Sequence, residues 1–257
     1  MNPLEQTRQK YPKQIVNVNG VPVEFVRTGG AGRAVLMLPG AQGTAESFCQ
    51  QLIAFGGQRD IISINYPGLE QVESVVDLVV ELASHLRVEH FDIVGTSLGG
   101  YVAQWIAAMH PARVGRAVIG NSFHDPRAVQ GPEKLSALQN KTAEQLKLEV
   151  LERLIASPES DFKRLMLDLV GLRQTASELR NRMLLVQRAA VMRAAVPASI
   201  PVLLVECDND PLIPPAVREA IRTHYAGASV VQISGGGHYP YYVKADEYNQ
   251  AIGSFLA

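Results

Sequence analysis

Cysteine is scarce in this chain, with Cys49 and Cys207 the only two among 257 residues. Two thiols are too few for the disulfide framework that stabilises many small secreted proteins. Both lie in or beside segments that we expect to be buried, so we interpret them as free thiols of the core. The simplest location for such a chain is the cytoplasm.

An excess of charge of one sign is also missing. The 24 Lys and Arg side chains nearly balance the 25 Asp and Glu side chains, which gives a formal net charge of −1. Because the basic residues are scattered along the chain, they predict no patch for nucleic acid or for an anionic membrane surface.

Long apolar runs are absent as well. No window approaches the roughly 18 apolar residues that a membrane-spanning helix needs, and the polar opening MNPLEQTRQKYPKQ lacks the apolar region of a secretory signal. Metal and dinucleotide motifs, such as HExxH, paired cysteines or a dinucleotide fingerprint, do not occur. We therefore expect no membrane span, no metal and no cofactor.

What the sequence does contain is an ordinary globular balance, with 47% apolar and 19% charged residues. At this length we expect one α/β core with an insertion. Strand-like apolar runs alternate with helical patterns, which predicts a mostly parallel sheet covered by helices on both faces, and Asn19-Gly20 predicts an antiparallel hairpin at its edge. We expect strands at residues 14–19, 21–27, 34–38, 60–65, 91–94, 116–120, 202–206 and 230–233, and helices at 44–55, 69–86, 97–109, 215–225 and from 245.

The alternation stops in the middle of the chain. Between residues 125 and 196 only helical patterns occur, at 142–156 with Thr142 as the N-cap, at 161–172 and at 177–195. We therefore predict a helical cap at 125–196, inserted into a core formed by residues 1–124 and 197–257.

A glycine-rich hexapeptide, Gly95-Thr96-Ser97-Leu98-Gly99-Gly100, follows the strand at 91–94 and opens a helix. The GxSxG pattern is weak by itself, but a strand–turn–helix context is what a nucleophile elbow requires. Side chains two positions before and after Ser97 would clash in so sharp a turn, which explains the glycines at positions 95 and 99. The alternatives are a turn without chemistry and a phosphate-binding loop, although no Lys follows the glycines. We predict that Ser97 is a nucleophile.

A serine hydroxyl needs a base, usually a histidine oriented by a carboxylate. In folds with this elbow the serine, the acid and the histidine follow in that order. His238 lies in the loop SGGGHYP just after the last predicted strand, and we predict that it is the base. We interpret His224, within a helix, as a surface residue, and His124 as a candidate for the pocket lining.

The acid is expected after the strand at 202–206, where Asp208 and Asp210 are the candidates. We choose Asp210, directly before Pro211, and interpret Asp208 as a solvated turn residue. The oxyanion of a tetrahedral intermediate also needs two amide donors. We predict the backbone N–H groups of Leu98 and Ala41, the latter in the loop after the strand at 34–38.

Four segments in this order, PGAQGT, GTSLGG, CDNDPLIP and GGGHYP, resemble the α/β-hydrolase superfamily over essentially the whole chain outside the insertion. The resemblance implies the α/β-hydrolase fold and a triad of Ser97, Asp210 and His238, and it supports the choice of Asp210. That superfamily usually has His-Gly where this chain has Pro39-Gly40, which keeps the backbone donor but removes a side chain.

Other segments, including LPGAQGTAESFCQQLIAF and GTSLGGYVAQWIA, are similar more specifically to maspardin and its relatives. Animal maspardins lack the triad histidine and are regarded as binding proteins, whereas this chain has His238 at that position. The resemblance therefore implies two functions, catalysis by a complete triad or binding without catalysis.

The leading hypothesis is a serine hydrolase that cleaves an ester, thioester or lactone through an acyl-enzyme on Ser97. The alternatives are a carbon–carbon bond hydrolase with the same triad and a non-catalytic binding or adaptor protein. Met183, Leu184 and Val186 of the insertion suggest a small-molecule substrate with a partly apolar acyl group, although packing of the cap explains them equally well.

Overall fold

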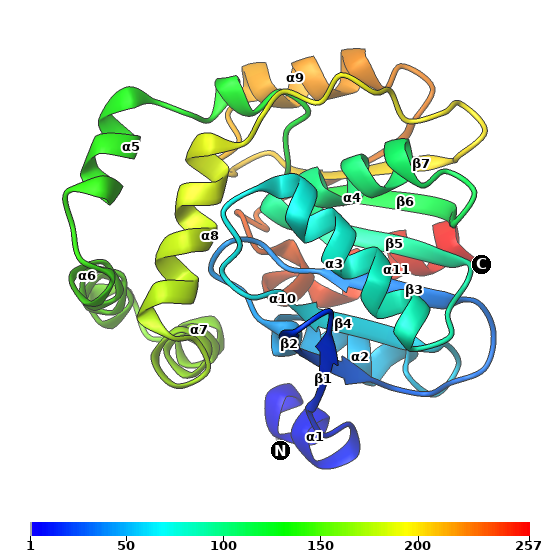
Figure 1. Cartoon of the computed structure of the whole chain (residues 1–257), viewed down its shortest axis with the longest axis horizontal. Helices are drawn as coiled ribbons and strands as arrows, with labels where there is room; N and C mark the ends of the chain where they lie inside the picture. The colour runs from blue at the N-terminus through cyan, green and yellow to red at the C-terminus, as the bar shows by residue number, and fades with distance from the viewer. Residues whose placement is uncertain (1) are drawn as a thin grey trace.

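The centre of the molecule is an eight-stranded sheet with the order β1-β2-β4-β3-β5-β6-β7-β8 (Figure 1). The computed structural model describes residues 2–257. β1 and β2 form an antiparallel hairpin, β2 is antiparallel to β4, and every other neighbouring pair is parallel. The strands are β1 (Gln14–Val18), β2 (Val21–Arg27), β3 (Ala34–Leu38), β4 (Ile61–Asn65), β5 (Phe91–Thr96), β6 (Val114–Gly120), β7 (Val202–Cys207) and β8 (Ser229–Ile233).

The predicted hairpin is confirmed. Asn19 and Gly20 have φ angles of 51° and 87°, and they connect the paired residues Val18 and Val21. Two successive left-handed residues match the right-handed twist of the flanking strands, which is why Asn-Gly favours this turn.

Two layers of helices cover the sheet, because alternate side chains of each strand face opposite ways. In β3, Leu36 and Leu38 belong to the apolar cluster that includes side chains of α3, α4 and α9, whereas Val35 and Met37 belong to the cluster that includes side chains of α2 and α11. Strands covered on both faces have continuous apolar sequences, as predicted for residues 34–38. The covering helices are α2 (Cys49–Phe55), α3 (Val72–His85), α4 (Leu98–Met109), α9 (Pro215–His224) and α11 (Ala245–Leu256).

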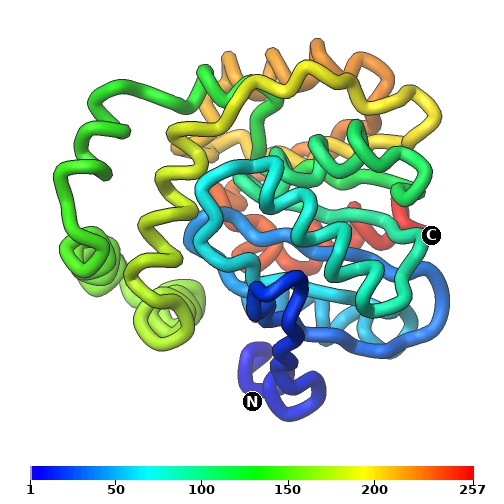
Figure 2. The backbone as a smooth tube through the Cα atoms, viewed as in Figure 1, coloured from blue at the N-terminus to red at the C-terminus, as the bar shows by residue number. Residues whose placement is uncertain are grey.

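In the described chain, the segment between β6 and β7 contains helices and loops but no strand. Its helices α5 to α8 lie beside the sheet, at the left of Figures 1 and 2. They confirm the predicted helical insertion, while its division from the core at residues 125 and 196 stays a prediction. Thr142 is the N-cap of α6, as expected, and accepts from the Gln145 amide. The segment contains the short 3₁₀ helix η2 (Pro126–Ala128), α5 (Pro132–Gln139), α6 (Ala143–Ala156), α7 (Asp161–Leu172) and α8 (Ala176–Arg188).

Two predicted helices are shorter than expected. The helix predicted at 69–86 begins at Val72, because Gly68 belongs to a turn whose carbonyl accepts from Asn181 of α8. The helix predicted at 177–195 ends at Arg188. There the Gln130 side chain donates to the carbonyls of Val186 and Ala189, which replaces continued helical bonding.

Three short helices were not predicted: α1 (Pro3–Lys10), α5 and α10 (Pro240–Val243). Each has proline in its first turn, but few apolar positions to give helical periodicity. In α1 only Leu4 and Thr7 are buried, so contacts with the rest of the chain stabilise it.

The two thiols are free and buried, as predicted. Burial raises the pKa of Cys49 to about 12 and that of Cys207 to about 11, so neither is a reactive thiolate at neutral pH. Across residues 2–257, no helix has the length and apolarity to cross a membrane.

Candidate active site

Ser97 lies at a sharp turn between β5 and α4, with φ 54° and ψ −122°. This left-handed conformation is strained for a residue with a side chain. A methyl group on Gly95 would overlap the backbone of Gly99, and one on Gly99 would overlap the carbonyl of Leu38. Gly95 and Gly99 are therefore required, because there is no room for a side chain at either position, as the sequence predicted.

The backbone of Ser97 is fixed from β6 as well. Its N–H donates to the Gly120 carbonyl at 2.9 Å, and its own carbonyl accepts from the Ser122 hydroxyl at 2.7 Å. The first turn of α4 lies directly behind it, so the positive end of that helix dipole faces the space beside Ser97.

His238 and Asp210 come from loops that follow the neighbouring strands β8 and β7. Gly235 and Gly237, with φ angles of 72° and 59°, allow the histidine loop to turn back over the sheet. The structure brings the two side chains together, because Nδ1 of His238 forms a 2.8 Å hydrogen bond with Oδ2 of Asp210.

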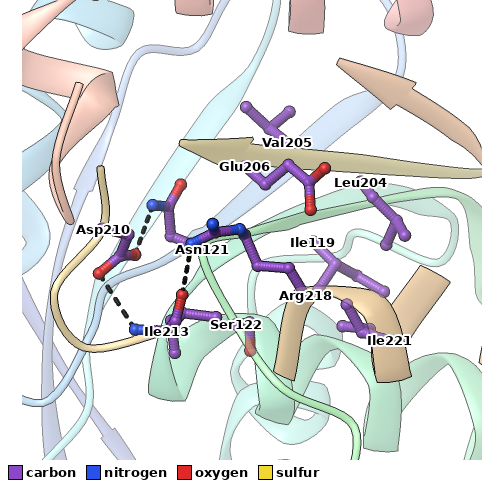
Figure 3. Close-up of a pocket in the computed structure, with 10 residues that line it drawn as sticks. All are labelled: Ile119, Asn121, Ser122, Leu204, Val205, Glu206, Asp210, Ile213, Arg218 and Ile221. Carbon is purple, nitrogen blue, oxygen red and sulfur yellow. Dashed lines mark hydrogen bonds between the residues drawn. The ribbon is translucent and has the colours of Figure 1, made fainter. Parts of the chain in front are cut away.

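The carboxylate of Asp210 accepts hydrogen bonds at both oxygens (Figure 3). The Asn121 amide donates to Oδ2 at 2.6 Å, and the N–H groups of Leu212 and Ile213 donate to Oδ1 at 2.8 and 3.2 Å. Burial by itself raises the pKa of Asp210, but the bond and charge of His238, with Asn121 and Leu212, outweigh it and hold the pKa below its usual value.

This arrangement fixes the histidine tautomer. Because Asp210 is ionised at neutral pH, it can only accept, so Nδ1 of His238 carries the proton. Nε2 then keeps its lone pair and is available as a base.

The other acidic and histidine candidates lie elsewhere. Asp208 is exposed and accepts from the Gly235 amide at 3.0 Å, so it braces the histidine loop without contacting the imidazole. His224 is exposed, as predicted for a surface residue. His124 stacks on it with ring centroids 4.5 Å apart, and it does not line the cavity beside Ser97, contrary to what we expected.

The segment after β3, residues 39–44, is here named the β3–η1 loop, because it leads to the 3₁₀ helix η1 (Ala45–Phe48). It passes against the elbow, since a Cβ on Gly40 would lie 3.1 Å from Cβ of Ser97. Within residues 2–257, the amide N–H groups of Ala41 and Leu98 have no hydrogen-bond partner. Both predicted oxyanion donors are therefore free, and Ala41 lines the same cavity as Ser97.

A cavity of about 660 Å³ extends from this point toward the helices of the insertion. Ser97, Ala41 and His238 line it. Across the described chain no hydrogen bond joins Ser97 to His238, a contact that often forms only when substrate is bound.

The insertion contributes apolar side chains to the lining of this cavity. Met183 and Val186 line it, as the sequence suggested. Leu184 instead packs with Leu138 and Leu146 inside the insertion. These side chains suit a partly apolar ligand.

Two positions beside the site were not identified from the sequence. Asn121 holds Asp210, and its amide also donates to the Gly237 carbonyl at 2.9 Å. The sequence feature that could have identified Asn121 is its position directly after β6, because the carboxyl end of that strand lies at the sheet edge that carries Ser97. Arg218 of α9 donates to the Ile213 carbonyl (Figure 3). It also donates to the Asp208 carbonyl, on the other side of Asp210.

A model of the alpha/beta hydrolase family matches residues 35–251, which is most of the chain. The chain belongs to the alpha/beta hydrolase family. This match confirms the predicted α/β-hydrolase fold.

Individual relatives agree with this assignment. The chain is 27% identical to Maspardin from Danio rerio over 226 residues, which cover 85% of this chain and 72% of that protein. It is 29% identical to a pimeloyl-[acyl-carrier protein] methyl ester esterase from Neisseria meningitidis over 177 residues, 64% of this chain and 69% of that protein. The solved structure of an enol-lactonase from Burkholderia xenovorans LB400 matches with a TM-score of 0.79 at 16% identity, covering 95% of this chain and 99% of that one.

Proposed function

We propose that this protein is a serine hydrolase that cleaves an ester, thioester or lactone through an acyl-enzyme on Ser97. In this proposal His238 is the general base and Asp210 holds its imidazole. The amides of Ala41 and Leu98 bind the oxyanion.

The reaction follows from these roles. Oγ of Ser97 attacks the substrate carbonyl carbon while Nε2 of His238 takes the hydroxyl proton. The carbonyl oxygen becomes negative and is stabilised by the two amides. The intermediate collapses, the bond to the leaving group breaks, and His238 protonates that group. Water then repeats the sequence on the acyl-enzyme, which releases the acid and restores Ser97.

One observation carries the proposal: the 2.8 Å bond between His238 and Asp210 lies at the cavity that a strained Ser97 also lines. A strained residue and a buried carboxylate–imidazole pair are costly to maintain, and such costs concentrate at functional sites. The esterase and the lactonase among the similar proteins support the choice of acyl transfer.

Binding without catalysis is the second candidate, favoured by the similarity to Maspardin. A protein that only binds has no chemical need for a hydrogen-bonded His238–Asp210 pair beside Ser97. Carbon–carbon bond hydrolysis with the same residues also stays a hypothesis, and no residue among 2–257 favours it over ester cleavage.

A fluorophosphonate probe, with p-nitrophenyl butyrate as substrate, tests the proposal. We expect an adduct on Ser97, and we expect the variants Ser97→Ala and His238→Ala to lose turnover by about 10⁴-fold or more while remaining folded. The matched controls are Ser199→Ala and His224→Ala, which change exposed residues outside the cavity.

Two results would contradict the proposal. The first is a folded protein with no adduct on Ser97, which would favour the binding protein. The second is unchanged turnover in the Ser97→Ala variant, which would place the chemistry at another residue.

A further inference from the structure

The β3–η1 loop is held through its carbonyl oxygens. Pro39 accepts from the hydroxyl of Tyr66, and Gly40 accepts from the Gly43 amide within the loop. The carbonyls of Gln42 and Gly43 accept from two side chains of the insertion, Gln174 at 2.6 Å and Arg182 at 2.7 Å. Donors outside the loop therefore determine where its free Ala41 amide points.

Arg182 lies on α8 and is completely buried. Its guanidinium donates to the Gly43 carbonyl, to Oδ1 of Asn65 at the end of β4 and to Oε1 of Gln174. Within residues 2–257 no carboxylate forms an ion pair with it. Burial lowers the pKa of Arg182, although the arginine side chain keeps its proton in proteins.

Gln174 joins the guanidinium to the same loop. Its Oε1 accepts from Arg182 at 2.6 Å, and its Nε2 donates to the Gln42 carbonyl. Gln174 is itself buried and lies between α7 and α8. Two adjacent carbonyls of the β3–η1 loop are therefore bonded to one connected pair of side chains.

A buried guanidinium without a carboxylate partner is an energetically unfavourable group for packing a helix. A buried charge without an ionic partner loses its hydration, and apolar residues of similar volume are often equally or more stabilising. What a guanidinium offers in exchange is several N–H donors in a rigid plane. Here one of those donors bonds directly to the loop that passes against Ser97, and another reaches the loop through Gln174.

We propose that Arg182 and Gln174 are positioning residues, through which the insertion holds the β3–η1 loop so that the Ala41 amide faces the reacting carbonyl. This inference rests on the function proposed above. The insertion then completes the oxyanion site as well as enclosing the cavity.

Substitutions separate this role from simple packing. Arg182→Met removes all the donors, and we expect kcat for p-nitrophenyl butyrate to fall about 100-fold, as for a displaced catalytic group, while KM changes less than threefold. Arg182→Lys keeps N–H donors on a single nitrogen, so it restores part of the rate.

Gln174→Glu provides a variant that should fold even if Arg182→Met does not. A glutamate still accepts from Arg182 and supplies the missing carboxylate, but it cannot donate to the Gln42 carbonyl. We expect an unchanged or higher melting temperature and a kcat about 10-fold lower, the value of one hydrogen bond.

Gln130→Leu is the matched control. Gln130 anchors the other end of α8 through the carbonyls of Val186 and Ala189 and does not touch the β3–η1 loop. It should lower the melting temperature and leave kcat within twofold. The rate of fluorophosphonate labelling, which also builds negative charge on oxygen, should fall in parallel with kcat in the Arg182 and Gln174 variants only.

Two outcomes overturn the inference alone: folded Arg182→Met and Gln174→Glu variants with kcat within twofold of the unmodified chain, or an equal loss of kcat in Gln130→Leu. An unmodified chain that neither labels nor hydrolyses the ester would instead overturn the proposed function, and the inference with it.

Discussion

Asn121 shows how much a single side chain contributes at the candidate site. It has a left-handed φ of 41°, and one amide nitrogen donates both to Asp210 and to the Gly237 carbonyl. It therefore joins the loop of the acid to the loop of His238. Its own backbone follows β6 and donates to the Val205 carbonyl of β7 at 2.8 Å.

We expect the Asn121→Gly variant to lose about 10- to 100-fold in kcat/KM, because a hydrogen bond to a charged group contributes about 1.5–3 kcal/mol. Glycine accepts the left-handed φ, so the backbone should not change. Steady-state kinetics with p-nitrophenyl butyrate measures the effect. The control Asn19→Gly alters another left-handed asparagine, remote in the β1–β2 turn, and a similar loss there would refute the local explanation.

At this scale the sequence predicted the residues whose signals are local. Ser97 lies between required glycines, His238 lies in a glycine-rich loop, and Asp210 follows a strand. Asn121 and Arg182 were not predicted, because their bonds reach residues far along the chain, such as Asp210 and Gly43. No periodicity or short motif encodes such contacts.

At the scale of elements, α1 is attached to the insertion through ion pairs. Arg8 donates to both oxygens of Glu46 in η1 and to both oxygens of Asp168 in α7. Leu4 of α1 also packs with Leu165 in a small apolar cluster. The N-terminal helix therefore stabilises the position of α7 relative to the core.

We expect Asp168→Asn to lower the free energy of unfolding by about 1–2 kcal/mol at pH 7, or about 2–6 °C in melting temperature. The hydrogen bond from Arg8, with the charges of Arg8 and Arg173, lowers the pKa of Asp168 below 3.8. A carboxylate with a lowered pKa stabilises the fold above its ordinary pKa. The stability difference should therefore be complete at neutral pH and disappear as the pH falls below 3.8.

Thermal unfolding across pH measures this effect. Asp161→Asn is the control, because that carboxylate lies on the same helix but is 79% exposed, and its pair with Arg164 should contribute little. A stability difference for Asp168→Asn that persists unchanged at acidic pH would contradict the ionic explanation.

The predictability of each element depends on where its stabilisation comes from. The buried strands were predicted because burial on both faces selects continuous apolar runs, as in Ala34–Leu38. The polar helix α1 was not, because distant side chains hold it. The end of α8 was misplaced for the same reason, since Gln130 is more than 50 residues away in sequence.

At the scale of the whole molecule, the cavity between core and insertion is lined by both apolar and charged side chains. Apolar side chains such as Phe123, Val129 and Ile213 line it together with Ser97. The lysine, arginine and glutamate side chains that line it all come from α5, α6 and the link between them. They are Lys134, Lys141, Glu149 and Arg153.

These charged side chains of the lining carry an excess of positive charge. Glu149 pairs with Lys141 at 2.6 Å. Among residues 2–257, Lys134 and Arg153 have only carbonyl partners, at Val129 and at the Glu149 backbone. An ester with an apolar acyl chain and an anionic group at its far end would therefore match both kinds of side chain that line the cavity.

We expect a preference for the mono-p-nitrophenyl ester of adipic acid over p-nitrophenyl hexanoate, which differs only in the terminal carboxylate. Combining Lys134→Gln with Arg153→Gln should reduce that preference about 3- to 10-fold, because each exposed pair contributes about 0.2–1 kcal/mol. Hydrolysis of the hexanoate should not change, since its acyl chain carries no charge.

Salt and a variant outside the cavity separate local binding from the overall electrostatic field of the molecule. Sodium chloride at high concentration should weaken the preference for the adipate ester. Arg164→Gln, on α7, removes an exposed charge outside the cavity and should leave the preference intact. If Arg164→Gln reduced it as much as the double variant, the net charge of the molecule rather than the lining of the cavity would select the substrate.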